Sequence, residues 1–274
     1  MKKTLYILLT TLSIISCQQD VFFDLPEYQD KVVIYSLMRA DTFPGAIVTR
    51  SVSIYEPRNY EELGISDATV ILTGTDWSDT LKTKDSIPKG VYFSLNHKIK
   101  HNETYTLTVQ IPNEKTYIIS TKVPEKSTVD SVRVKKISNS SNGDSVSLAY
   151  FYFKPPARTA YYSVHYFRVS SDKTPSQVNP DEVKLPKYEP FTDGLPFRFV
   201  DTEIENRLYI MRRAFEKGDT VKILFRHINL EYYDYLRTSL QNSETGEPVR
   251  IISNIPGGLG VFGGFSEEEV KWVF

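Results

Sequence analysis

The sequence predicts an all-β protein built from two β-sandwich domains of the immunoglobulin or fibronectin type, with one helix in the second domain. The first reason is the alternation of apolar and polar residues in short runs, which is typical of half-buried strands. The second is composition, because the chain has 18 Tyr and 15 Phe and aromatic residues favour strands. The third is the punctuation of the runs by Gly, Pro, Asn and Asp at intervals of about 8–15 residues, as in antiparallel sandwiches.

The first sandwich is predicted to cover residues 27–125. We expect its strands at 30–39, 46–55, 68–74, 90–95, 104–111 and 115–124. Turn residues separate these runs, since Gly, Pro, Asn and Asp favour backbone angles that strands do not adopt. They are Pro44-Gly45, Gly74 with Asp76, Pro88 to Gly90, and Pro112-Asn113.

The second domain is predicted to cover residues 126–274 and to contain a helix near 230–241. Apolar residues from Leu230 to Leu240 recur at helical spacing, and Asn229 is a candidate N-cap. The Pro-rich stretch 171–196 is expected to be a long loop, and 254–264 a glycine loop. The expected strands are 127–137, 144–153, 159–170, 197–201, 207–215, 219–228, 248–253 and 269–274.

Residues 1–16 are predicted to be a signal peptide. Lys2 and Lys3 precede an apolar run of about 11 residues, too short for the roughly 20 that span a bilayer but within the length of a signal-peptide core. Two alternatives stay open: an ordinary signal peptide followed by a free thiol, and an uncleaved hydrophobic start.

Cys17, the only cysteine, directly follows this run. Ile14-Ile15-Ser16-Cys17 resembles the lipobox of bacterial lipoproteins. The resemblance implies cleavage before Cys17, a diacylglycerol on its sulfur and acylation of the new amino terminus. Two or three chains anchor a protein far more firmly than one. We therefore expect a lipidated tether at 17–26. Asp20 stands at the third position after Cys17, and CQQD partly matches acidic surface-export signals, so we expect an outer-membrane lipoprotein exposed at the cell surface.

Charge is nearly balanced, with 33 basic and 34 acidic residues. No basic field is present to attract nucleic acid, so we expect no nucleic-acid partner. With its one cysteine lipidated the chain forms no disulfide, and its stability is expected to come from burial and strand pairing.

The tail carries a family resemblance. A tyrosine-rich helix followed by NIPGGLGVFGG (254–264) resembles a family of Bacteroidota outer-membrane lipoproteins, domain of unknown function number 4249. SDATVILTG, GVYFS and NETYTLTV resemble the first domain of that family. The resemblance implies an all-β lipoprotein, often encoded beside TonB-dependent transporters of the SusC-like kind, and it implies no catalytic residues.

The tail also contains a literal G-x-G-x-x-G at Gly258, Gly260 and Gly263. A dinucleotide site needs a helix and a second strand after this motif, and only 11 residues (274 minus 263) follow it. We interpret the glycines as positions of positive φ or close backbone approach. Val261 and Phe262 would then plug the core or contact a partner or ligand.

No residue pattern predicts an enzyme, a cofactor or a metal centre. His97 and His101 share a face if 97–101 is a strand, with Glu103 beyond, but zinc sites need three or four ligands from more than one segment. The sequence 142–145 (Asn-Gly-Asp-Ser) superficially resembles an esterase nucleophile block. Carboxylate pairs could serve acid–base chemistry in a cleft, although solvated charge explains them better: Glu61/Glu62, Asp76/Asp79 and Glu267–Glu269.

An Asp-Ser/Thr-aliphatic pattern recurs and is similar to an O-glycosylation sequon of exported proteins in the same lineage. The candidate acceptors are Thr80, Ser86, Ser131, Ser145 and Thr220. The alternative is that Asp ends a turn before a strand. Clustered aromatics could stack on carbohydrate, although core packing explains them better: Tyr161, Tyr162, Tyr166, Phe167, Tyr232, Tyr233 and Tyr235.

The leading functional hypothesis is a non-enzymatic surface lipoprotein, held in the membrane by its lipid, that serves a TonB-dependent transporter as accessory or substrate-capture subunit. The alternatives are a structural or adhesive surface lipoprotein that binds glycans or matrix, and a hydrolase with an atypical site.

Overall fold

The computed structural model describes residues 28–53, 60–126, 128–138, 145–153, 159–169, 196–200, 207–213, 220–245 and 250–273. The predicted signal peptide, the tether with Cys17 and nearly all of the predicted loop at 171–196 lie outside these residues. No helix in the described part is both long and apolar enough to cross a bilayer.

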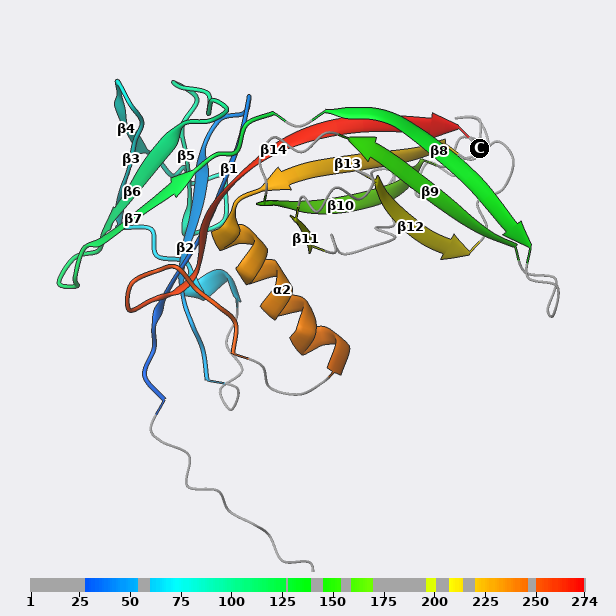
Figure 1. Cartoon of the computed structure of the whole chain (residues 1–274). Helices are drawn as coiled ribbons and strands as arrows, with labels where there is room; N and C mark the ends of the chain where they lie inside the picture. Colours follow the sequence, from blue (N-terminus) through cyan, green and yellow to red (C-terminus); the bar gives the residue numbers. More distant parts are fainter. Residues whose placement is uncertain are drawn as a thin grey trace, which may run out of the picture.

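The described residues form three sheets and confirm the all-β prediction (Figure 1). The largest sheet has the order β11 (Pro196–Val200), β10 (Thr159–Val169), β13 (Thr220–Ile228), β14 (Leu259–Val273), β1 (Val32–Arg39), β2 (Gly45–Arg50) and β5 (Val91–Phe93). The second has the order β4 (Ser78–Leu81), β3 (Thr69–Thr73), β6 (Thr104–Gln110) and β7 (Tyr117–Lys122). The third has the order β12 (Arg207–Arg213), β9 (Ser145–Phe153) and β8 (Val129–Ser138).

A sandwich core lies between the second sheet and the β14–β1–β2–β5 part of the largest sheet. Alternate residues of β1 and β6 are buried, as their period-two sequences predict. Each fully buried aliphatic or aromatic side chain contributes about 1.5–3 kcal/mol. Ile34, Val48 and Tyr92 enter this core from one sheet, and Leu72 and Leu107 from the other.

Strand β14 joins the two halves of the chain. Its first half pairs in parallel with β1, from Val33↔Leu259 to Arg39↔Phe265. Its second half pairs antiparallel with β13, from Ile228↔Phe265 to Thr220↔Val273. The predicted domain boundary at 125/126 falls between β7 and β8. β14 therefore follows that boundary in sequence but supplies a strand to the first sandwich.

The prediction of a glycine loop over 254–264 followed by a strand at 269–274 is wrong in its boundaries. The loop ends at Gly258 and the strand begins at Leu259. Glycine suits these strand positions because neighbouring segments approach the strand so closely that a side chain would clash with them. A Cβ at Gly263 would lie 2.8 Å from Cβ of Tyr232, and one at Gly264 would lie 2.9 Å from Cα of Val123.

The helix prediction is confirmed, and α2 runs from Leu230 to Thr245. Asn229 caps it, because the Tyr232 amide donates to Asn229 Oδ1 at 3.2 Å. The same side chain donates to Thr121 Oγ1 at 2.6 Å and accepts from the Gly264 amide at 3.1 Å. One asparagine thus fixes the helix start against β7 and β14.

Two further differences have local causes. β4 was not predicted, because its sequence Ser78–Leu81 is mostly polar. It forms a strand through its antiparallel pairing with β3. A strand was predicted at 248–253, but residues 250–253 are not in a strand. There the Ile252 amide donates to Thr238 Oγ1 of α2 at 3.0 Å instead of to a strand partner. A short 3-10 helix, Tyr60–Leu63, follows β2.

Candidate functional site

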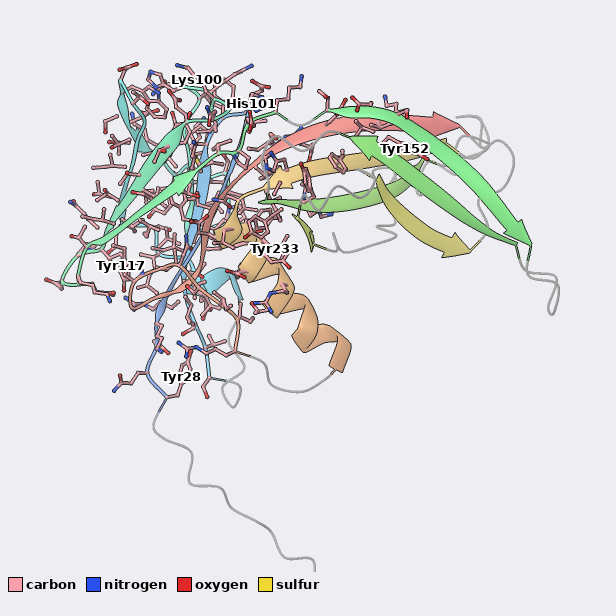
Figure 2. The ribbon with its side chains drawn as sticks, in the orientation of Figure 1. Tyr28, Lys100, His101, Tyr117, Tyr152 and Tyr233 are labelled. Atoms are coloured by element: carbon pink, nitrogen blue, oxygen red, sulfur yellow. The ribbon has the colours of Figure 1, made fainter. Side chains whose placement is uncertain are left out.

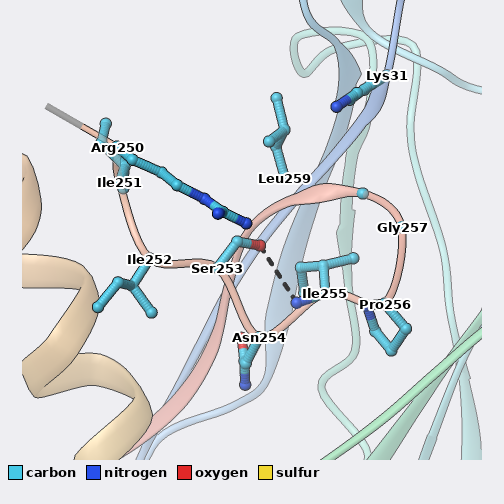
Figure 3. A pocket seen from close by; sticks show the side chains of 11 residues that line it. Lys31, Arg250, Ile251, Ile252, Ser253, Asn254, Ile255, Pro256, Gly257 and Leu259 are labelled. Carbon is cyan, nitrogen blue, oxygen red and sulfur yellow. Dashed lines mark hydrogen bonds between the residues drawn. The ribbon is translucent and has the colours of Figure 1, made fainter. Parts of the chain in front are cut away.

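A groove of about 960 Å³ lies beside the point where the described chain begins (Figure 3). It is lined by Lys31 and by the segment 250–259. Ile251, Ile252 and Leu259 are 40%, 41% and 37% exposed. An aliphatic surface that stays open to solvent in a folded body points to a binding function.

The groove segment is anchored in the core by one side chain. Ile255 is buried among the residues of the sandwich core. The Gly258 amide donates to the Ile255 carbonyl at 3.1 Å, which closes a turn. Gly257 has a φ of +69°, a conformation in which glycine is favoured because it has no Cβ. The sequence Ile-Pro-Gly-Gly therefore makes a tight turn around a buried isoleucine.

Asn254 fixes the shape of this segment. Its Nδ2 donates to the Phe262 carbonyl at 2.8 Å, and its Oδ1 accepts from the Phe262 amide at 2.9 Å. The side chain thus satisfies both backbone groups of one strand residue. Together with the bond from Ile252 to Thr238, this holds the groove wall between β14 and α2.

The rim of the groove is positively charged. Lys31 and Arg250 line it and are exposed. In the described part of the chain, neither forms an ion pair. Lys115 contacts the groove segment and donates through Nζ to the Pro256 carbonyl at 3.1 Å. The groove therefore combines aliphatic side chains with cations that are available to an anionic partner.

The tail residues that the sequence singled out divide between the groove and the core. Gly258 lines the groove, whereas Gly260, Val261, Phe262 and Gly263 belong to β14. Val261 and Phe262 are 0% exposed. Their burial fits the core alternative and contradicts a direct partner contact through these two side chains. β14 continues to Val273 as a strand.

A second surface, the loop end, lies at the opposite end of β1 and consists of residues 40–44, 74–77 and 94–102. In Figure 2, Lys100 and His101 mark the loop end and Tyr28 marks the end where the described chain begins. Backbone bonds hold two of the loops side by side, from the Asp41 amide to the Ile99 carbonyl at 2.8 Å and from the Ile99 amide to the Thr42 carbonyl at 2.9 Å.

Apolar and basic side chains are exposed together at the loop end. Phe43 is 43% and Leu95 63% exposed. Lys98 places its Nζ 5.6 Å from the centre of the Phe43 ring, a cation–π distance. The Ser94 amide donates to the Pro44 carbonyl at 3.2 Å, which sets the loop of Leu95 beside that of Phe43.

The Asp79 carboxylate orders the loop at 94–102. Ser94 Oγ donates to this carboxylate, and Asn96 Nδ2 donates to Asp79 Oδ1 at 3.0 Å. Partial burial acts to raise the pKa of Asp79, but the hydrogen bonds from Ser94 and Asn96 outweigh it and hold the pKa below its usual value. His97 lies near the same carboxylate and stacks on Trp77, with ring centres 4.5 Å apart.

The histidine pair considered as a metal site is not assembled. His97 faces Asp79, whereas His101 Nε2 lies 3.0 Å from Asp41 Oδ2. Among the described residues, no group of three or more potential metal-ligating side chains exists. The residues of the esterase-like block, 142–145, lie outside the described ones except for Ser145 at the start of β9.

The carboxylates of β14 have structural partners. Glu267 is bound by Arg226 and Arg39, Glu268 Oε2 accepts from the Val129 amide at 2.5 Å, and Glu269 lies 3.7 Å from Lys271. The contacts of Glu267 and Glu268 join different strands and were not predicted, because strand register decides which charges meet. The Glu269–Lys271 pair lies within β14 and is exposed.

Two of the predicted aromatic residues lie in the core. Tyr162 is buried and stacks with Phe225, and Tyr232 of α2 is buried and packs on Phe265. Tyr161, Tyr233 and Tyr235 are half-buried. Burial raises the pKa of Tyr35, with further contributions from Tyr232 and Tyr235. The side chains of Tyr166 and Phe167 lie outside the described set. Of the candidate glycosylation sites, Thr80, Ser86 and Ser131 are exposed, and the side chains of Ser145 and Thr220 lie outside the described set.

Three solved structures give distant matches. A cytokine receptor complex has 6% identity over 88% of this chain and 95% of its own, with a TM-score of 0.26. The alpha-2-macroglobulin of Salmonella, reacted with methylamine, has 10% identity over 92% of this chain and 15% of its own, with a TM-score of 0.25. The chicken interferon gamma receptor alpha chain has 10% identity over 90% of this chain and 99% of its own, with a TM-score of 0.20. No conclusion about function follows from similarities of this size.

No curated protein matches the chain. The family model described as Domain of unknown function (DUF4249) matches residues 18–271. That span includes the groove segment, the loop end and all of α2. The chain therefore belongs to the DUF4249 family.

Proposed function

We propose that this chain is a lipid-anchored protein of the outer membrane, exposed at the cell surface, that serves a TonB-dependent, SusC-like transporter as a non-enzymatic accessory or substrate-capture subunit. The lipobox-like sequence ending in Cys17 supports the anchor. The family resemblance of the sequence supports the transporter as partner.

The single observation that supports a docking role best is the loop end. It exposes Phe43, with Lys98 over its ring, and Leu95 at the end of β1 opposite the start of the described chain. Hydrogen bonds between the loops already hold these residues in place, so binding costs little ordering entropy. A protein anchored at Cys17 would direct such a surface away from the anchor.

Affinity purification of the full-length, C-terminally tagged protein from detergent-solubilised outer membranes tests the proposal. We expect a TonB-dependent transporter to co-purify. Phe43→Asp and Leu95→Asp should each lower its recovery at least about tenfold, because a buried charge replaces an apolar contact. Ile118→Asp is the matched control, because Ile118 is 61% exposed on β7, away from the loop end.

Recovery of the protein only as a free monomer would contradict the transporter hypothesis. Binding of glycans or matrix protein by that monomer would favour the adhesive alternative. Equal loss of the transporter in all three variants would place the docking surface elsewhere.

A further inference from the structure

We propose that the groove is a membrane-docking face that takes the anionic headgroups of the lipids in which the protein is anchored. The inference deepens the proposed function and rests on its lipid anchor at Cys17. The occupant follows from three properties of the groove: its position in the chain, its exposed side chains and its charge.

The position limits how far the groove can be from the anchor. Lys31, which lines the groove, is 14 residues (31 minus 17) from Cys17. A fully extended chain of that length spans at most about 50 Å. An anchored groove therefore stays within this distance of the lipid surface, where the effective headgroup concentration is high. A weak affinity is then sufficient for docking.

The side chains match an interface between headgroups and acyl chains. Ile251, Ile252 and Leu259 are aliphatic and exposed, and Figure 3 shows Arg250 reaching from Ile251 toward Leu259, with Lys31 beyond Leu259. Surfaces that lie in the membrane interface combine apolar residues at the acyl boundary with Lys and Arg at the headgroups. Each cation near an anionic surface strengthens binding about fivefold, which corresponds to about 1 kcal/mol.

The backbone of the groove needs no rearrangement to dock. The Asn254 bonds to Phe262 and the Ile252 bond to Thr238 hold it in the unbound body. Ile252 and Leu259 are thus presented as fixed surface groups. A protein partner could use the same apolar side chains, but Lys31 and Arg250, which form no ion pair with any residue that the structure describes, lie beside the start of the anchored chain and favour the membrane.

The test uses the full-length acylated protein reconstituted into phosphatidylcholine vesicles with about 30 mol% phosphatidylglycerol, a content that gives a negative surface potential. An environment-sensitive fluorophore is placed at Ile252→Cys, in the groove, or at Leu95→Cys, at the loop end, and lipids that carry a quencher in the acyl chain are added. Acylation of Cys17 leaves the introduced cysteine as the only reactive thiol. We expect strong quenching at position 252 and little at position 95.

Charge reversal supplies the matched comparison. Lys31→Glu with Arg250→Glu should lower the docked fraction at position 252 at least about tenfold, and pure phosphatidylcholine vesicles should have a similar effect. Lys84→Glu with Lys98→Glu, the same change at exposed lysines near the loop end, should not.

The outcomes separate the two proposals. Protein that pellets with vesicles but shows equal quenching at positions 252 and 95 overturns the docking and leaves the anchor intact. Shielding of position 252 only after a purified transporter is added also overturns it, in favour of a protein partner. Protein that stays in the supernatant with a labelled Cys17 overturns the anchor, and the docking with it.

Discussion

Arg226 and Glu267 are register partners on β13 and β14, and Nε of Arg226 lies 2.6 Å from Oε2 of Glu267. Arg39 of β1 reaches the other oxygen of the same carboxylate at 2.8 Å. The Glu267 side chain is 3% exposed. One buried carboxylate thus connects three strands, two from the second half of the chain and one from the first.

Glu267→Gln should lower the free energy of unfolding by about 3–5 kcal/mol, because it leaves the largely buried Arg226 without its counter-charge. Arg39→Gln should cost less than about 1 kcal/mol, since the Arg39 side chain is 49% exposed. Urea denaturation of the full chain measures both values. Equal losses in the two variants would contradict the central role of the Arg226 pair.

His165 should make stability depend on pH. Burial, reinforced by the adjacent Arg226, lowers its pKa to about 4, and Arg226 Nη1 donates to the neutral ring at 2.7 Å. Burial also lowers the pKa of His227, although its bond to the Glu125 carbonyl opposes the shift. Between about pH 6.5 and 4 the unfolded histidine binds a proton that the folded one does not. Stability should therefore be complete above pH 6.5 and decline as the pH falls.

The slope from each such histidine is at most about 1.4 kcal/mol per pH unit. His165→Gln keeps an acceptor for Arg226 and cannot titrate, so its stability curve should be flatter in this window. Urea midpoints taken between pH 4 and 7 measure the difference. Parallel curves for the variant and the unmodified chain would show that His165 is not the responsible group.

Asn254 should be essential for the groove. Asn254→Ala leaves the Phe262 amide and carbonyl without their side-chain partners, and each unsatisfied buried group costs about 1–3 kcal/mol. We expect a loss of about 2–4 kcal/mol in unfolding free energy, with faster amide exchange at Phe262. Gln110→Ala, an exposed polar truncation on β6, should change stability by less than about 0.5 kcal/mol. Similar losses of stability in the two variants would argue against this role of the Asn254 hydrogen bonds to Phe262.

Replacement by alanine should destabilise the chain far more at Gly260 than at Gly257. Gly260 has a φ of +101°, and a Cβ there would lie 2.1 Å from the backbone oxygen of Ile34 on the paired strand. Gly260→Ala should therefore cost at least about 3 kcal/mol or prevent folding. At Gly257 the obstacle is the flexible end of Lys115, so Gly257→Ala should cost about 1 kcal/mol, mainly from its positive φ. Thermal unfolding of both variants checks the order.

Local patterns predicted most of the fold. Apart from β4 and β14, the strands of the first sandwich follow from period-two spacing, as α2 with its Asn229 cap follows from helical spacing, and the structure has them within a few residues. The tail was harder, because the glycines of 258–264 suggest a loop. These residues form a strand in which glycine leaves room for the close approach of Tyr232 and Val123. Both of these neighbours are distant in sequence.

The candidate site was predicted only in part. The sequence drew attention to the segment that builds the groove, but it pointed to Val261 and Phe262, which are buried. Ile251, Ile252 and Lys31 carry no local signal, because their meeting depends on the parallel pairing of β1 with β14. Phe43 and Leu95 likewise meet only through bonds between loops.

Transporter docking and membrane docking both depend on the proposed lipid anchor at Cys17. The most direct measurement is the intact mass of the full-length gene product purified from membranes. We expect a polypeptide that starts at Cys17 with a diacylglyceryl thioether and an acylated amino terminus, and any additional sugar mass would report use of the Asp-Ser/Thr sites. A chain that retains residues 1–16, or one with a free Cys17 thiol, would contradict the anchor.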